Sequence, residues 1–357
     1  MQSVLGFVAV LTFPSVLVAQ DVPKYPAPQQ VKAAFKKLLD RPKVPLDVKI
    51  VSGNRLNDGS HHWFLTFAAE KKAGGAIERV PTFIKIPAGA KGRLPAVIVL
   101  HGTGGSIESG GVMSFINDLA QRNIIGIAID ARYHGARVPG SKGSVAYNQA
   151  VVRAWKTKPG EPMEHPFFYD TVWDLWRLLD YLETRPDIDM KKIGMIGFSM
   201  GGIQTYLAAS VDDRVKVSVP AIAVQSFRLS LEKDLWQGRA NTIRLAHQVA
   251  AKDLGEPEVN QKVVRALWSK IVPGITGDYD CPSLIRLFAG RPLLILSGTK
   301  DKNCPYEGAQ LAIASARRAY KDAGAEARLS VLVEDVGHTV TPRQRAAALA
   351  WFEKWLP

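Results

Sequence analysis

Short, almost uninterrupted apolar runs recur along this chain from residue 94 onward. A run without polar alternation is typical of a strand that is buried on both faces, as in a parallel sheet. We therefore expect the central strands at these runs, which are residues 94–100, 124–130, 193–196, 215–219, 293–297 and 329–333.

Residues 171–185 show the 3.6-residue period of an amphipathic helix. Thr171 and Asp174 have the spacing of a capping box, and Pro186 is expected to end the helix. Strands that alternate with such helices predict an α/β fold, with a mostly parallel central sheet and helices on both faces. Its functional site should lie at the carboxyl ends of the strands.

The region before residue 94 has a different pattern. Residues 47–56, 61–70 and 79–87 are β-like segments separated by glycine-containing turns, which predicts antiparallel strands at the start of the sheet. A short amphipathic helix is expected at residues 31–39.

These patterns divide the chain into three parts. We expect a signal peptide at residues 1–19, a linker with the N-terminal helix at 20–45, and one α/β domain at 46–357. Two insertions interrupt the domain, at 136–168 and 221–290. The second contains helical stretches at 241–252 and 259–271, and we expect it to form a cap over the functional site.

The N-terminal segment has the composition of an export signal. Residues 3–19 carry no charge and end in a small residue, Ala19, as signal-peptidase sites do. The sequence therefore predicts a secreted or periplasmic protein without stable membrane insertion after cleavage. The alternative is an uncleaved membrane anchor, for which the segment is short and contains Pro14.

Composition and charge narrow the classes of partner. The 357 residues are 46% hydrophobic and 22% charged, as in a folded enzyme with a large core. The net charge is +13, but the basic residues are scattered, without a run or an aromatic-interleaved motif. We therefore expect no nucleic-acid partner.

The chain has two cysteines, Cys281 and Cys304. They can form a disulfide in an oxidising compartment or remain buried free thiols, and the sequence leaves both open. Because no pair of histidines has ligand spacing, we expect no metal site.

The candidate nucleophile lies in residues 197–201, Gly-Phe-Ser-Met-Gly, directly after the apolar run that ends at Ile196. A G-x-S-x-G motif between a strand and a helix is typical of a nucleophile elbow, which exposes the serine at the strand's carboxyl end. We therefore take Ser199 as the nucleophile. The alternative is a helix-capping serine in a glycine-rich turn.

A serine nucleophile needs a base, and the base needs an orienting acid. His338 lies in a loop between the last predicted strand and the last helix, whereas His247 lies within a helix. Asp301 follows the strand at 293–297 and a glycine turn. We take His338 as the base and Asp301 as the acid; the competing acids are Glu334, Asp335 and, more weakly, Asp278 and Asp280.

Residues 101–105, His-Gly-Thr-Gly-Gly, follow the strand at 94–100 and are close to an HGGG-type oxyanion loop. We assign the oxyanion hole to the backbone N–H of Met200 and that of Thr103 or Gly104. His101 is expected to brace this loop by hydrogen bonding.

These motifs, in this order, resemble those of the α/β-hydrolase superfamily. The similarity is to the branch of dienelactone hydrolases, acetyl xylan esterases and prolyl-oligopeptidase-like enzymes. The matching segments are residues 101–105, 130–135, 197–201, 298–301 and 337–338. Dienelactone hydrolases proper carry a cysteine nucleophile where this chain has Ser199, and the insertion before Asp301 is unusually long.

The resemblance implies a serine hydrolase that cleaves small or acetylated carboxylic esters through an acyl-enzyme, without a cofactor or metal. The alternatives are a prolyl-oligopeptidase-like peptidase, whose propeller would not fit in the about 90 residues before Leu94, and a non-catalytic binding protein. Tyr133, Trp236 and Trp268 are candidates for substrate contact. The two tryptophans can instead pack the cap onto the sheet.

Overall fold

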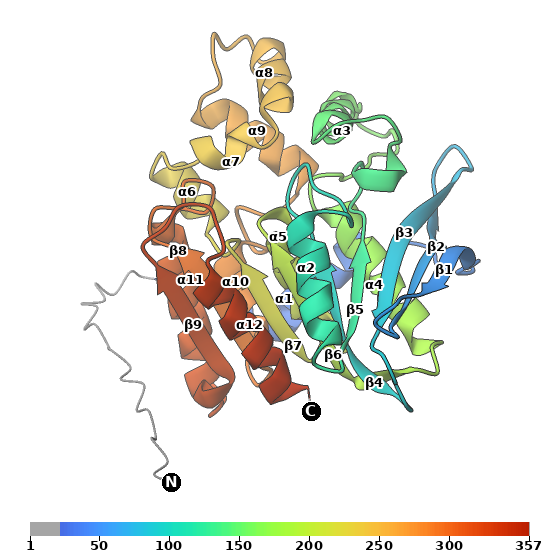
Figure 1. Cartoon of the computed structure of the whole chain (residues 1–357). Coiled ribbons are helices and arrows are strands. Elements are labelled where there is room, and N and C mark those ends of the chain that lie inside the picture. The colour runs from blue at the N-terminus through green and yellow to red at the C-terminus, as the bar shows by residue number, and fades with distance from the viewer. Residues whose placement is uncertain (1–21, 357) are drawn as a thin grey trace.

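A computed structural model describes residues 22–356 of the chain and shows one mixed sheet with helices on both faces (Figure 1). The order of the strands across the sheet is β1-β2-β3-β5-β4-β6-β7-β8-β9. The strands are β1 (Lys49–Arg55), β2 (His61–Lys71), β3 (Ile77–Ile86), β4 (Leu94–Leu100), β5 (Ile125–Ile129), β6 (Ile188–Phe198), β7 (Val217–Ala221), β8 (Leu293–Gly298) and β9 (Leu329–Glu334).

The sheet is antiparallel at its N-terminal edge and parallel elsewhere. β1 pairs with β2, β2 with β3 and β3 with β5 in antiparallel register, while β4 to β9 all run parallel. This is the α/β architecture with antiparallel N-terminal strands that the apolar runs predict. Because β4 and β6 to β9 all point the same way, the loops after β4, β6, β8 and β9 emerge at one edge.

Helices cover both faces of this sheet. They are α1 (Pro28–Leu39), α2 (Gly110–Ala120), α3 (Val145–Lys156), α4 (Tyr169–Glu183), α5 (Met200–Val211), α6 (Phe227–Glu232), α7 (Gln237–Asn241), α8 (Arg244–Asp253), α9 (Gln261–Ile271), α10 (Cys281–Ile285), α11 (Tyr306–Asp322) and α12 (Pro342–Trp355). Short 3-10 turns lie at Gly135–Arg137, Arg286–Phe288 and Glu326–Arg328.

The central strands are buried on both faces, which explains their continuous apolar runs. In β4, Ala96 and Ile98 pack into a core with residues of α1, α4, α5 and α11, whereas Val97 and Val99 pack into a second core with α2 and α12. Successive side chains of a strand point to opposite faces, so neither face tolerates polar residues here.

Helix α4 begins earlier than its sequence pattern predicts, and the expected capping box is wrong. The N–H of Thr171 donates to the carbonyl of Phe168, so the helix already begins at Tyr169. Thr171 Oγ1 instead accepts the N–H of Arg132, and Asp174 accepts two hydrogen bonds from the Arg132 guanidinium. The side chains of Thr171 and Asp174 therefore bind Arg132 and do not cap the helix.

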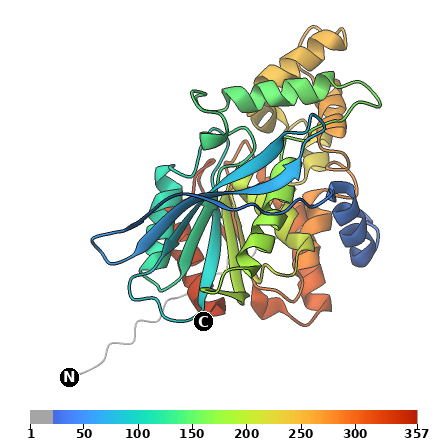
Figure 2. The ribbon, with the colours of Figure 1, turned by 90° about the vertical axis from the view of Figure 1, so that its right-hand side faces the viewer.

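The two predicted insertions come together above the carboxyl edge of the sheet (Figures 1 and 2). α3, from the first insertion, packs against α8 and α9 from the second, and α7 packs against α8. We call α3 and α6 to α9 the cap. The end of the second insertion does not belong to it, because α10 packs against α5 and α11 in the body of the domain.

The predicted signal peptide at 1–19 lies outside the described residues. The predicted helix at 31–39 is part of α1, which packs against α4, α5 and α10. Between residues 22 and 356, none of the helices combines the length and the apolar character that crossing a bilayer requires.

Candidate active site

Ser199 lies in a sharp turn between β6 and α5. Its φ of 55° and ψ of −112° are unusual for a residue with a side chain. Backbone hydrogen bonds hold this strained conformation: the Ser199 N–H donates to the carbonyl of Ala221 at 3.0 Å, and its carbonyl accepts the N–H of Ile203. Strain that is fixed in this way keeps the hydroxyl at the carboxyl edge of the sheet.

The glycines around Ser199 lie so close to neighbouring atoms that there is no room for a Cβ. A Cβ on Gly197 would lie 2.1 Å from the carbonyl oxygen of Gly201, and one on Gly201 would lie 2.6 Å from that of Leu100. A Cβ on Gly202 would lie 2.5 Å from the side chain of Ala223. The backbone approaches at this turn therefore exclude any larger residue.

The structure brings together the three side chains predicted to act as nucleophile, base and acid. The Ser199 hydroxyl lies 2.7 Å from His338 Nε2, and His338 Nδ1 lies 2.8 Å from Asp301 Oδ2. Since a carboxylate only accepts, Nδ1 carries the proton and donates to Asp301, which leaves Nε2 free to accept from Ser199. This is the hydrogen-bond order that a Ser-His-Asp relay requires.

Asp301 is fixed more tightly than the other two. Its Oδ1 accepts the backbone N–H groups of Asn303 at 2.8 Å and Cys304 at 2.9 Å. Its side chain is 1% exposed, whereas that of His338 is 24% exposed. Asp301 is therefore buried and oriented by its own loop, while the His338 imidazole is partly exposed.

The competing acids are engaged elsewhere. Glu334 bonds to Thr341, and Asp335 bonds to Lys300 and Thr299 at the surface. Asp278 is exposed. Asp280 is buried and caps α10, and it also accepts the Ser226 hydroxyl at 2.5 Å and the N–H of Phe227. Burial raises the pKa of Asp280 to about 6, but it makes no contact with His338.

The loop after β4 lies against the elbow. A Cβ on Gly102 would lie 3.4 Å from the carbonyl oxygen of Phe198 and 3.6 Å from Ser199 Cβ. The N–H groups of Met200, Thr103 and Gly104 find no acceptor within residues 22–356. Free donors beside the nucleophile are what an oxyanion hole requires.

His101 braces this loop, as expected. Its Nδ1 donates to the carbonyl of Gly102 at 2.8 Å, and its Nε2 accepts the N–H of Ala131 at 3.1 Å. Burial lowers the pKa of His101 to about 4, so the ring is neutral near pH 7 and holds this tautomer. The ring thereby ties the oxyanion loop to the end of β5.

Comparison with known proteins gives the family. A model of the Alpha/beta hydrolase family matches residues 97–350, which include every residue of the site described above. The chain belongs to this family. It is also similar to YtaP of Bacillus subtilis (strain 168), a protein named for an inferred hydrolase activity. The two are 26% identical over 290 residues, which cover 78% of this chain and 84% of YtaP.

Solved structures have the same fold. Acetyl xylan esterase 1 from Thermoanaerobacterium sp. JW/SL YS485 superposes with a TM-score of 0.66 at 18% identity, over 94% of this chain and 96% of that one. A glucuronoyl esterase from Solibacter usitatus gives 0.62 at 15% identity, over 92% of both chains. An acetyl xylan esterase from Paenibacillus sp. R4 gives 0.58 at 20%, over 92% of this chain and 93% of that one.

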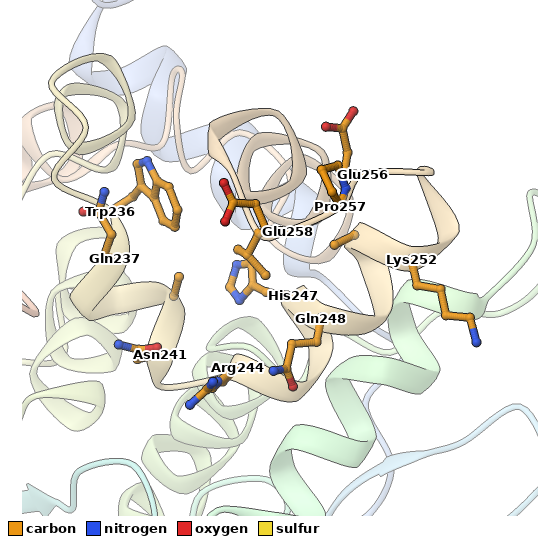
Figure 3. Close-up of a pocket in the computed structure, with 13 residues that line it drawn as sticks. Trp236, Gln237, Asn241, Arg244, His247, Gln248, Lys252, Glu256, Pro257 and Glu258 are labelled. Carbon is orange, nitrogen blue, oxygen red and sulfur yellow. The ribbon is translucent and has the colours of Figure 1, made fainter.

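The three aromatic candidates for substrate contact lie in different surroundings in this hydrolase. Trp268 is fully buried and packs edge-on against Phe227. It therefore belongs to the core of the cap and does not line a substrate site. Trp236 lines a cavity in the cap (Figure 3). Within residues 22–356, neither tryptophan forms a hydrogen bond or an aromatic contact with Ser199, Asp301 or His338.

Tyr133 lies after β5 with a φ of 61°, another strained residue. Its hydroxyl bonds to Glu164, and the cations of Lys72 and Arg153 lie 5.5 and 5.4 Å from the centre of its ring. These contacts hold the phenol toward the first insertion, so the side chain is not free to reach Ser199 without breaking them.

Sequence reasoning missed Arg239, a buried residue of the cap. Its Nη2 donates to Cys304 Sγ at 3.0 Å, and the Cys304 thiol donates to the carbonyl of Ile222 at 3.2 Å. Cys304 Sγ, a carboxylate oxygen of Asp301 and a ring nitrogen of His338 all lie within 4.8 Å of one another. Arg239 therefore lies against the loop that carries Asp301.

The close contact between α7 and the acid loop explains how Arg239 reaches this position. A Cβ on Gly238 would lie 2.0 Å from the carbonyl oxygen of Lys302, so only glycine permits the approach. In the sequence, Arg239 is an ordinary polar residue of a short helix. No local pattern distinguishes it from a surface arginine, because the contact joins segments that are distant along the chain.

Both cysteines are free, buried thiols in the structure, so the disulfide alternative is not realised. Burial raises the pKa of Cys304 to about 12, so the thiol is protonated at neutral pH. Asp301, Cys304 and His338 are close enough to be considered as metal ligands. However, Asp301 and His338 are hydrogen-bonded to each other and a metal-binding cysteine must be a thiolate, so the donor set fits the relay better.

Proposed function

We propose that this α/β hydrolase is a serine esterase that cleaves small or acetylated carboxylic esters, including esters of carbohydrates, through an acyl-enzyme. The observation that carries the proposal is the continuous set of hydrogen bonds from the Ser199 hydroxyl through His338 to Asp301. The fold neighbours named as acetyl xylan and glucuronoyl esterases support the choice of ester chemistry.

In the first half of the reaction, Ser199 Oγ attacks the carbonyl carbon of the ester. His338 Nε2, 2.7 Å away, takes the hydroxyl proton as the new C–O bond forms. Asp301 stabilises the resulting imidazolium through its hydrogen bond to Nδ1. When the tetrahedral intermediate collapses, the bond to the alkoxide breaks, and His338 gives its proton to the departing alcohol.

The negative charge of the intermediate develops on the former carbonyl oxygen. The free N–H groups of Met200 and of Thr103 or Gly104 are the donors for this charge, and Met200 is the first residue of α5. The positive end of the helix dipole adds to their effect. A water activated by His338 then attacks the carbonyl carbon of the acyl-enzyme, and the same donors stabilise the second tetrahedral intermediate. Its collapse returns the proton to Ser199 and releases the carboxylic acid product.

Hydrolysis of p-nitrophenyl acetate by the wild type and by Ser199→Ala tests the proposal. We expect the wild type to hydrolyse the ester and the variant to do so only at a residual rate, with an unchanged melting temperature. Equal rates in both proteins would refute the assignment of Ser199. A panel of peptide p-nitroanilides run beside the ester tests the peptidase alternative, since a peptidase would prefer the amides.

We also propose that residues 1–19 direct export and are removed, which leaves a secreted or periplasmic enzyme. The support is the uncharged segment that ends at Ala19. The intact mass of the protein recovered from the exported fraction tests this. A mass that still includes residues 1–19, in a protein that sediments with membranes, would favour the anchor instead.

A further inference from the structure

The cap contains a cavity of its own, separate from the triad. It has a volume of about 890 Å³ and is lined by residues of α7, of α8 and of the segment that follows α8, all between Trp236 and Val259 (Figure 3). This volume is in the range of small-molecule sites. None of the nucleophile, base, acid or oxyanion residues lines it, so the mechanism above leaves this cavity without a role.

Unpaired polar side chains surround the cavity. Asn241, Arg244, Gln248 and Glu258 are exposed and line it, and their side chains make no hydrogen bond or ion pair within the described part of the chain. In Figure 3 they come from two helices and from the following segment. Two amides, a guanidinium and a carboxylate offer donors and acceptors together, which suits a ligand that carries both.

The inner wall is apolar but contains two unpaired polar atoms. Trp236 is 8% exposed and His247 is fully buried, and Trp236 Nε1 and His247 Nε2 have no partner within residues 22–356. His247 Nδ1 donates to the carbonyl of Ile243, so Nε2 is an acceptor while the indole N–H is a donor. Leaving buried polar atoms unpaired is unfavourable, and a bound polar ligand or a water would give both atoms a partner.

The charges of the lining residues cancel. The lining holds two cations, Arg244 and Lys252, and two carboxylates, Glu256 and Glu258. Glu256 also pairs with Lys262 outside the lining, so no large excess of cations gathers here although the whole chain carries a net charge of +13. A site for a phosphate or another anion in so basic a protein would show an excess of cations. The lining therefore fits a neutral ligand, and its mixed donors and acceptors beside an indole ring fit a polyhydroxylated one.

We propose that the cap cavity binds a neutral sugar unit of a carbohydrate chain whose ester is cleaved at Ser199. The choice of a carbohydrate substrate rests on the proposed function. The fit of the cavity to a sugar rests on the residues that line the cavity. Hydroxyl groups of the sugar bond to the amide and charged side chains at the rim, and its C–H face packs against Trp236 and Ala240.

The position of α7 connects this cavity with the site of ester cleavage. Trp236 and Ala240 face the cavity, while Gly238 lies against Lys302 of the acid loop and Arg239 bonds to Cys304. A sugar bound in the cavity thus lies across α7 from the loop that carries Asp301. The cavity can therefore hold a distal unit of a chain whose esterified unit lies at Ser199.

The test measures sugar binding without catalysis. Ser199→Ala protein is titrated with xylotetraose, cellotetraose and inorganic phosphate by calorimetry, alone and with Arg244→Ala, Gln248→Ala or Asn241→Ala added. Arg265→Ala is the matched control, since Arg265 is an exposed cap arginine outside the cavity. The three rim side chains are exposed and unpaired, so these variants should fold; melting temperatures check this.

We expect at least one tetraose to bind. Each rim variant should weaken its binding by roughly fivefold, the effect of one lost hydrogen bond, whereas Arg265→Ala should not change it. In the protein with Ser199 intact, the rim variants should lower kcat/KM for acetylated xylotetraose but not for p-nitrophenyl acetate.

Three results would overturn the proposal: no binding of either tetraose, binding that all rim variants leave unchanged, or binding of phosphate alone. Failure of the proposed esterase function would look different, because p-nitrophenyl acetate would not be hydrolysed even though sugars bound. Loss of sugar binding with normal hydrolysis of p-nitrophenyl acetate would therefore refute the cavity proposal alone.

Discussion

Arg239 Nη2 donates to Cys304 Sγ at 3.0 Å, and this bond links the cap to the loop that carries Asp301. The backbone N–H of Cys304 in turn holds Asp301 Oδ1 at 2.9 Å. The guanidinium is fully buried, and no carboxylate within residues 22–356 forms an ion pair with it. Arg239 of the cap is thereby part of what positions Asp301.

Arg239→Met should therefore impair catalysis, although the residue is remote from the substrate. The variant keeps the aliphatic volume but removes the donor to Cys304, and a slightly displaced acid is expected to lower kcat/KM by roughly ten- to a hundredfold. Kinetics with p-nitrophenyl acetate measure the effect. Arg265→Met, in the same cap, should have little effect, and full activity of Arg239→Met would show that the link is dispensable.

Asp301→Asn should reduce kcat by about 10⁴-fold without unfolding the protein, because an amide no longer stabilises the imidazolium or enforces its tautomer. Asp335→Asn is the matched control, since Asp335 is a competing acid that bonds to Lys300 at the surface. Comparable losses in both variants would contradict the assignment of Asp301 as the acid.

Gly201→Ala should severely destabilise the protein. The new Cβ would lie 2.6 Å from the carbonyl oxygen of Leu100 and 2.7 Å from that of His101, and these backbone atoms cannot move aside as the end of a side chain can. Gly110→Ala is the control, since a Cβ there meets nothing within 4 Å. Urea unfolding compares the two. A normal unfolding midpoint for Gly201→Ala would mean that the elbow is looser than its geometry indicates.

Stability should decline on acidification between about pH 6.5 and pH 4. Burial lowers the pKa of His101, His134 and His247 from 6.5 to about 4, so the unfolded chain takes up protons in this window before the native protein does. Each histidine then contributes up to about 1.4 kcal/mol per pH unit to the loss. Their contribution is fully present above pH 6.5.

Unfolding free energies measured from pH 4.5 to pH 7 check this dependence. His134→Gln should reduce the slope, whereas substitution of the exposed His61 should leave it unchanged. A profile with the same slope in wild type and His134→Gln would exclude His134 as one of the responsible groups.

The sequence predicted those features that are local. The elbow at Ser199, the loop before His338 and the turn before Asp301 each carry their signal within a few residues of a buried strand. The capping box at Thr171 failed because two long-range contacts of Arg132 use those side chains. Contacts that join distant segments have no local pattern to reveal them.

The cap shows the same limit. Its helices follow from their periodicity, and α8 and α9 lie close to the predicted stretches 241–252 and 259–271. Their packing with α3 and the position of Arg239 behind Asp301 depend on the tertiary arrangement. For the same reason, the sequence alone could not decide whether Trp268 packs inside the cap or contacts the substrate.

Intact-mass labelling with a fluorophosphonate shows whether Ser199 is an activated nucleophile. The reagent phosphonylates a serine oxygen with loss of fluoride only when a base activates that oxygen. We expect one adduct on the wild type and none on Ser199→Ala. No adduct on folded wild type, or an equal adduct on both proteins, would contradict this assignment.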